Sequence, residues 1–209
     1  MVRLGVVGLL ALVFPLVPMQ SGPAKVRVGD GPSYTADGQL KFPEKYREWV
    51  FLSSGLDMSY DPKPMDMGSS TFNNVFVNPE AYRAYQQTGH WPEGTEIVLE
   101  NRAADKGTRS ASLNKAGKTQ STQMTGLEVH LLDSARLAPK HENDGWGFYS
   151  FSNPVSAEVI PRAANCYSCH EQHAAVDTTF VQFYPTLMEA AEKHKSLSAG
   201  YLKEIGAAK

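Results

Sequence analysis

Apolar and polar residues alternate along several short segments of the chain, and a period of two is typical of β-strands with one buried face. From 127 to 131 every second residue is Leu or Val, whereas Glu128 and His130 fall on the opposite face. The segment 146–151 is aromatic on both faces, so we expect it to be covered on both. The pattern predicts strands over residues 73–77, 95–102, 126–133 and 146–151.

Other segments carry start and stop signals of helices. Asn78, Pro79 and Glu80 form a strong helix start, with Asn as the cap, Pro in the first turn and Glu facing the dipole, and Gly89 marks the end. Further helices are expected over 42–51, from about 162 through 170, and over 180–194, where Pro185 predicts a break or a late start.

The order of these segments predicts the fold class. No internal repeat is present, and segments 57–70 and 103–122 have the composition of a loop and of a long exposed hairpin connection. Such a succession favours an α+β protein, with a predominantly antiparallel β-sheet, flanking helices and the 162–170 helix near the C-terminus.

The first residues have the pattern of an export signal. Arg3 precedes an apolar run over 4–17, and small and polar residues follow it. The run is short for a membrane span, which needs about 20 apolar residues, although an uncleaved anchor is the alternative. We therefore expect a signal peptide over 1–24, an extended lead-in over 25–41 and a single domain over 42–209. The protein would be periplasmic or otherwise exported, with no membrane span after signal removal.

Charge and cysteine content narrow the functional classes. The net charge of the 209 residues is −2, so no basic excess indicates a nucleic-acid partner. Both cysteines of the chain lie in Cys166-Tyr167-Ser168-Cys169-His170, which has the C-x-x-C-H spacing of c-type haem attachment.

The spacing has a mechanical reason. Positions i, i+3 and i+4 of a helix lie on one face, so Cys166 and Cys169 can each add to a vinyl group of one porphyrin while His170 reaches the iron. The motif predicts one covalent haem c, with Cys166 and Cys169 as thioethers and His170 as the axial iron ligand.

Three other interpretations of the cysteine pair explain less of the pattern. A structural disulfide suits an oxidising compartment but does not explain the adjacent histidine. A thioredoxin-like pair is expected early in a βαβ pattern, whereas this pair lies near the C-terminus. A zinc site needs a second pair, and the chain has no other cysteine.

The ligand on the other side of the iron separates electron carriers from proteins with an open site. Met188 is the only methionine after His170, and methionine on a helix is commonly core. His173 shares the helix of His170 and cannot cross to the opposite face of the haem. His130 and His141 stay open as distal ligands.

Several stretches outside the motif form a second pattern: Tyr46–Val50, Phe72–Pro79, Thr88–Thr95, Gly126–Glu128, Gly145–Phe151 and Phe183–Pro185. With C-x-x-C-H placed behind most of them, the chain resembles the cytochrome P-460 family, which includes cytochrome c′-beta, over about residues 46–184.

The resemblance implies a mostly antiparallel β fold with a haem packed on the sheet, a five-coordinate iron with His170 proximal, and often a homodimer. It also implies two activities. Members with a lysine cross-linked to the porphyrin oxidise hydroxylamine, whereas members of the c′-beta type bind nitric oxide and related small gases behind aromatic side chains.

Three features bear on that choice. The segment 95–102, where the cross-linking lysine is expected, contains no lysine. In the family a glutamate can be a distal carboxylate, and Glu128 is its best match, with a solvent-facing strand residue as the alternative. Phe72, Phe76 and Phe148 are candidates for the haem pocket, with plain core as the alternative.

We therefore expect an exported mono-haem cytochrome with an open distal site that binds nitric oxide or a related small nitrogen species. A hydroxylamine-oxidising enzyme with a lysine-linked haem and a six-coordinate electron-transfer cytochrome are the alternatives. A small redox protein is the expected electron partner.

Overall fold

A computed structural model describes residues 29, 31–58, 70–105, 118–139 and 145–207 of the chain. The predicted signal peptide and His141 lie outside the described residues. Within those ranges, no helix is both long enough and apolar enough to cross a membrane.

A five-stranded antiparallel sheet forms the centre of the molecule, and each strand pairs with the next one along the chain. The predicted α+β class is therefore confirmed. The strands are β2 (Val50–Leu56), β3 (Thr71–Val77), β4 (Glu96–Asp105), β5 (Thr119–Leu132) and β6 (Trp146–Phe151). A second, two-stranded sheet joins β1 (Leu40–Lys41) to β7 (Ser156–Ala157).

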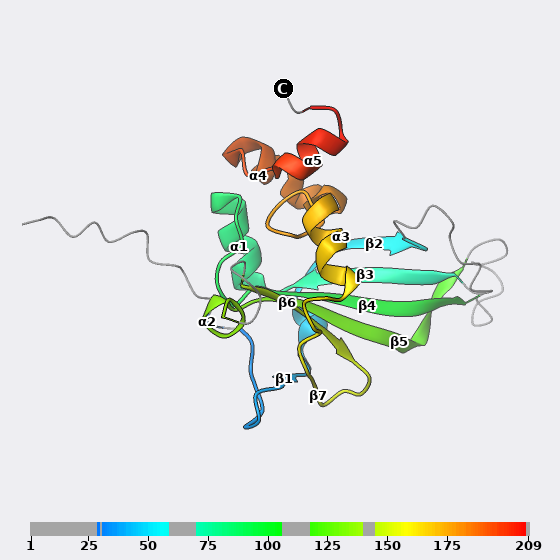
Figure 1. Ribbon diagram of the computed structural model, residues 1–209. Coiled ribbons are helices and arrows are strands. Elements are labelled where there is room, and N and C mark those ends of the chain that lie inside the picture. The colour runs from blue at the N-terminus through cyan, green and yellow to red at the C-terminus, as the bar shows by residue number, and fades with distance from the viewer. Residues whose placement is uncertain (1–28, 30, 59–69, 106–117, 140–144, 208–209) are drawn as a thin grey trace, which may run out of the picture.

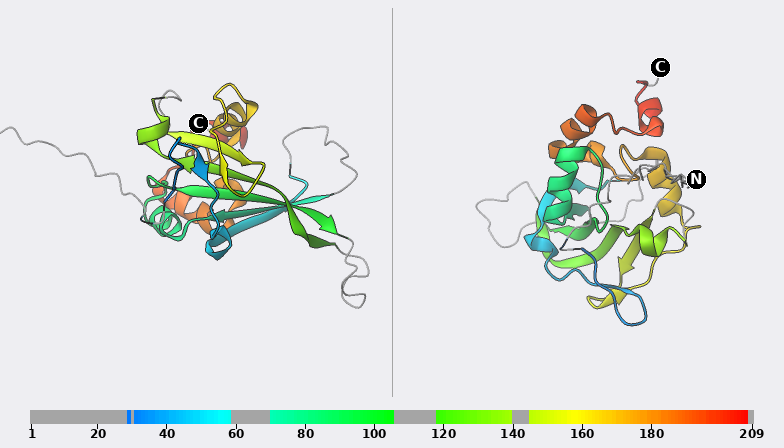
Figure 2. Two further views of the ribbon diagram at one scale, coloured as in Figure 1. Left: turned by 90° about the horizontal axis from the view of Figure 1, so that it is seen from below. Right: turned by 90° about the vertical axis from the view of Figure 1, so that its left-hand side faces the viewer.

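The helices lie mainly on one side of this sheet, and β1 and β7 lie on the other, as Figure 1 shows. The right-hand view of Figure 2 shows α4 and α5 on the side away from the blue N-terminal segment. The helices are α1 (Pro79–Thr88), α2 (Ser134–Leu137), α3 (Asn165–His173), α4 (Pro185–His194) and α5 (Ala199–Glu204), with 3-10 turns η1 (Tyr46–Glu48) and η2 (Val181–Phe183).

Alternation along the strands produces a separate apolar core on each face of the sheet. On the helix side, Ile97 and Trp146 pack with Tyr85 of α1 and Leu187 of α4. On the opposite side, the odd-numbered apolar residues of β5 pack with residues of β1 and η1. Five of the six residues of β6 are buried, on both faces, and residue 150 is the exposed one. The prediction that this strand is covered on both faces is therefore confirmed.

The helix predicted over 42–51 is wrong. The structure has a 3-10 turn over Tyr46–Glu48, and Val50 already begins β2, which pairs with β3. The apolar run at Val50–Leu52 is ambiguous from periodicity alone, and pairing with a neighbouring strand decides it.

The helix predicted to begin after Asn78 and to end at Gly89 is confirmed, but the role given to Asn78 is wrong. Its side chain makes no capping bond. Its Nδ2 donates to the carbonyl of Gly94 at 3.0 Å, and its Oδ1 accepts from the N–H of Glu96 at 3.0 Å. Asn78 thus fastens the start of α1 to the start of β4.

Candidate functional site

Helix α3 carries the entire C-x-x-C-H motif. Cys166 is exposed and Cys169 is half-buried, and neither forms a disulfide. Burial raises the pKa of the Cys169 thiol. The disulfide interpretation of the pair is therefore not what the structure shows, and both thiols are open to an external group.

Tyr167 fixes α3 on the edge strand β6. Its hydroxyl donates to the carbonyl of Ile160 at 2.9 Å and accepts from the N–H of Phe148 at 3.3 Å. Its ring meets Phe148 edge to face at 4.8 Å, and the Arg162 guanidinium covers it at 4.7 Å. The buried tyrosine points at the sheet, whereas Cys166 is exposed and Cys169 is half-buried.

His170 is held through one ring nitrogen. Its Nδ1 lies 2.7 Å from the carbonyl of Thr178, which can only accept, so Nδ1 carries the proton and Nε2 has the free lone pair. Its ring packs against Phe148 at 4.6 Å and Phe180 at 4.3 Å. Burial lowers the pKa of His170, so the neutral, metal-binding form is favoured.

His130 is buried beside His170. Its ring stacks on Phe148 at 4.1 Å with an interplanar angle of 9°, lies 4.3 Å from Trp146, and meets His170 edge to face at 5.0 Å. Burial, and secondarily the charge of His170, lower the pKa of His130 well below its ordinary value. Since the two imidazoles touch, no porphyrin fits between them in this arrangement.

The other suggested iron ligands have their own partners. The Nδ1 of His173 lies 2.9 Å from a carboxylate oxygen of Glu204 on α5. Met188 packs against the helix-side core, as expected for a core methionine.

The helix-side face of the sheet is covered only in part. The part of one row that crosses β3 to β6 is buried and consists of Val77, Ile97, His130 and Phe148. None of the residues in the next row is buried: Ser53, Val75, Leu99, Glu128 and Ser150. Figure 1 shows β3, β4 and β5 extending past the helices. A partly exposed surface, which we call the open row, therefore begins directly beside His130 and Phe148, the residues that contact His170.

Glu128 belongs to this open row. It lies two residues before His130 on β5, so the two side chains share a face of the sheet. Its side chain is exposed, yet nearby protein atoms desolvate it enough to raise its pKa.

The three phenylalanines predicted for the haem pocket lie on different faces of the sheet. Phe148 contacts His170, whereas Phe76 packs on Tyr46 and Phe51, each at 5.6 Å, on the opposite face. Phe72 lies four residues before Phe76 on the same strand and shares that face. The structure therefore brings only Phe148 of the three to His170.

Comparison with protein families matched residues 43–181 to Cytochrome P460. The chain belongs to this family. A search of the curated proteins found no match. Membership makes the chain a haem-binding cytochrome and confirms the resemblance drawn from the sequence.

The residues present fit the haem that the cytochrome P460 family implies. Two free thiols and an imidazole with an available Nε2 lie on α3, and the sheet on which α3 packs is covered only in part. Among the residues that the structure describes, no group of three or more His, Cys, Asp or Glu side chains could hold a metal ion by itself. The zinc interpretation therefore finds no ligand set there.

Sequence reasoning missed Thr178 and Phe180 as neighbours of His170. Both follow α3, in a turn whose path depends on contacts far away in the chain. The only sequence signal is their position within ten residues of His170.

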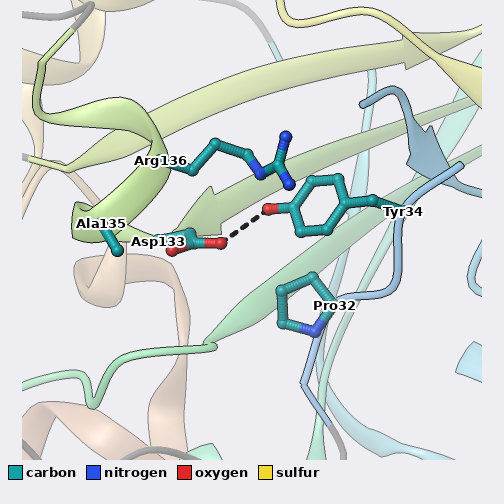
Figure 3. Close-up of a pocket in the computed structure, with 5 residues that line it drawn as sticks. All are labelled: Pro32, Tyr34, Asp133, Ala135 and Arg136. Atoms are coloured by element: carbon teal, nitrogen blue, oxygen red, sulfur yellow. Dashed lines mark hydrogen bonds between the residues drawn. The ribbon is translucent and has the colours of Figure 1, made fainter. Parts of the chain in front are cut away.

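A separate cavity of about 480 Å³ lies beside α2, lined by Pro32, Tyr34, Asp133, Ala135 and Arg136 (Figure 3). The Tyr34 hydroxyl donates to Asp133 at 2.9 Å, and Arg136 covers the Tyr34 ring at 3.8 Å. Tyr34 packs against the core on the opposite side of the sheet from His170, so this cavity is distinct from the motif.

Proposed function

We propose that the chain is an exported mono-haem cytochrome whose haem c is attached through Cys166 and Cys169, with His170 on the iron. Its open distal side binds nitric oxide or a related small nitrogen species. The observation that carries the proposal is that one helix presents two free thiols and an Nδ1-anchored histidine and packs on a sheet that is covered only in part.

A lysine-linked haem is disfavoured by the composition of the sheet. None of the five strands β2–β6 contains a lysine. Val75 and Leu99, at the centre of the open row, are apolar and cannot form the link. A bound haem supplies an iron that takes up small ligands, and these apolar side chains limit the water around such a ligand.

Glu128 favours a second candidate, the oxidation of hydroxylamine. That reaction requires removal of protons from N–H and O–H groups, and a carboxylate beside the ligand can accept them. The raised pKa of Glu128 makes it a better proton acceptor than an ordinary glutamate.

The absorption spectrum of the ferrous protein tests these candidates, after expression with haem-attachment machinery. We expect a high-spin, five-coordinate spectrum that changes when nitric oxide is added. A Soret band shifted far to the red would instead indicate a lysine-linked porphyrin. A low-spin, six-coordinate spectrum would overturn both candidates in favour of an electron carrier.

Covalent attachment has its own test. Cys166→Ala combined with Cys169→Ala should abolish haem staining on a denaturing gel, because both thioether bonds are lost. Ser168→Ala, in the same helical turn, is the matched control and should keep the stain. A stain retained by the double variant would contradict the attachment.

The proposal extends to location and partners. Residues 1–24 act as a signal peptide for export to the periplasm or an equivalent compartment, and a small redox protein exchanges electrons with the haem. The N-terminal sequence of protein recovered from the periplasm tests the first statement, and cleavage near residue 24 is the expected result. Sedimentation of the loaded protein tests for the homodimer that the family resemblance implies.

A further inference from the structure

A tight turn after α3 supplies the carbonyl that holds His170. Val176 and Thr179 exchange backbone hydrogen bonds of 2.7 and 3.3 Å across it. The two residues between them, Asp177 and Thr178, have φ values of 47° and 60°. This left-handed conformation is unfavourable for a β-branched residue such as threonine, so contacts elsewhere must maintain it.

One side of the turn is fastened to the loop after α1. The indole Nε1 of Trp91 donates to the Thr179 hydroxyl at 2.9 Å, and the Trp91 backbone N–H donates to the Asp177 carboxylate at 3.3 Å. These bonds fix both flanks of Thr178 but do not touch Thr178 itself.

The other side of the turn meets His130. The Nε2 of His130 lies 3.4 Å from the hydroxyl of Thr178, the residue whose carbonyl accepts from His170. His130 is itself immobilised between Trp146 and Phe148 in the buried row of the sheet. A polar ring thus occupies a position where an apolar residue would pack, and its Nε2 points at the turn.

We propose that His130 is a positioning residue for the axial histidine, acting through Thr178. His130 holds the Thr178 side chain, and thereby the left-handed turn, so that the carbonyl stays aligned with the Nδ1–H of His170. This inference rests on the proposed function, because it assumes that His170 binds iron through Nε2.

The consequence concerns the strength of the iron ligand. A histidine whose Nδ1–H donates to a well-aligned carbonyl is a more basic ligand. A stronger donor raises the iron–histidine stretching frequency and favours the ferric state, which lowers the midpoint potential. Loosening the turn should reverse both effects.

The test uses the haem-loaded protein and two conservative variants. His130→Phe keeps the stacked ring but removes its nitrogens, and Thr178→Val keeps the branched shape but removes the hydroxyl. For both, we expect the resonance Raman iron–histidine band of the ferrous protein to move to lower frequency and the midpoint potential to rise. The double variant should match either single variant, because one contact is removed in each case.

Unchanged Raman bands and potentials in both loaded variants would overturn the proposal and leave His130 as a core residue. Shifts that add up in the double variant would also overturn it, because the two residues would then act separately. Tyr149→Phe is the control, since Tyr149 lies next to Phe148 on β6 but faces the opposite core. A wild-type protein that carries no covalent haem would instead contradict the proposed function.

Discussion

His130 brings a titratable ring into a fully buried position between two aromatic side chains. Because burial lowers its pKa well below the ordinary 6.5, the folded protein keeps the ring neutral in mild acid. In the unfolded chain the same ring binds a proton as the pH falls below the ordinary value of 6.5. The unfolded state then holds more protons than the folded state, so stability declines as the pH falls.

His130→Phe should make the protein less sensitive to mild acid. Below about pH 6.5 the wild type should lose up to about 1.4 kcal/mol of unfolding free energy per pH unit relative to the variant. Urea unfolding of both loaded proteins between about pH 7 and pH 5 measures this difference. Parallel curves for the two proteins would show that His130 does not titrate on unfolding.

At Asn78 the helix was predicted correctly, but the role of the side chain was not. The Asn-Pro-Glu sequence predicts a helix start because the signal is local. The partners of the Asn78 side chain, Gly94 and Glu96, are 16 and 18 residues away, so no local pattern reveals them.

Asn78→Ser distinguishes the two roles. Serine is as good a helix cap as asparagine, so a capping role predicts almost no change. Because serine cannot span both partners in this buried place, we expect a loss of about 2 kcal/mol of unfolding free energy. Chemical unfolding measures it, and a neutral variant would restore the capping interpretation.

At the scale of elements, strands were predicted well where one face is apolar, as in β5 and β6. The end of β4 and the first half of β5 were not. Residues 103–105 are two alanines and an aspartate, residues 119–125 are mostly polar, and both stretches are ordered by pairing with each other or with β3. Helix α5 carries too weak a pattern in its six residues to be predicted, and it packs on α3.

The turn after α3 stores strain that a glycine would relieve. Thr178→Gly removes the penalty for a left-handed threonine, while the added freedom of the unfolded chain and the loss of the contact with His130 offset part of the gain. We expect a net increase of about 1 kcal/mol in unfolding free energy, measured in urea. A less stable variant would mean that the threonine side chain contributes more than its backbone conformation costs.

At the end of α1 a glycine already occupies the left-handed position, and a larger residue would not fit there. Gly89 has φ 73°, and a Cβ there would lie 2.6 Å from the Cβ of His194 on α4. Gly89→Ala should therefore lower the unfolding free energy by about 2 kcal/mol, from backbone strain and overpacking together. Thermal unfolding tests it, with Gln87→Ala on the exposed face of α1 as the control. An unchanged Tm would contradict the close packing of α1 on α4.

At the scale of the whole molecule, the C-x-x-C-H motif could be found in the sequence because it spans only five residues. The residues that surround it in space could not be predicted. The neighbours of His170 come from β5, β6 and the turn after α3, and the uncovered row is defined by strand register. Phe76 and Phe148 are equally aromatic, and only the strand faces separate them.

Protein without haem should expose the open row. Val75 and Leu99 would lose a covering group in the Cys166→Ala, Cys169→Ala variant. We expect its Tm to fall by roughly 5 °C or more, about 2 kcal/mol, and a hydrophobic dye to bind it more strongly. Ser168→Ala should behave as the wild type. Equal dye binding and equal Tm would show that the row is not a haem surface.

The simple strand order has a consequence for assembly. Since β2 to β6 pair strictly in chain order, each strand pairs with its nearest neighbour along the chain, and such local pairing costs less loop-closure entropy than pairing between distant strands. The C-x-x-C-H helix follows all five strands in the chain. If the chain is exported from its N-terminus as proposed, the cysteines leave the translocation channel after the strands, so the sheet can form before the proposed haem attachment takes place on α3.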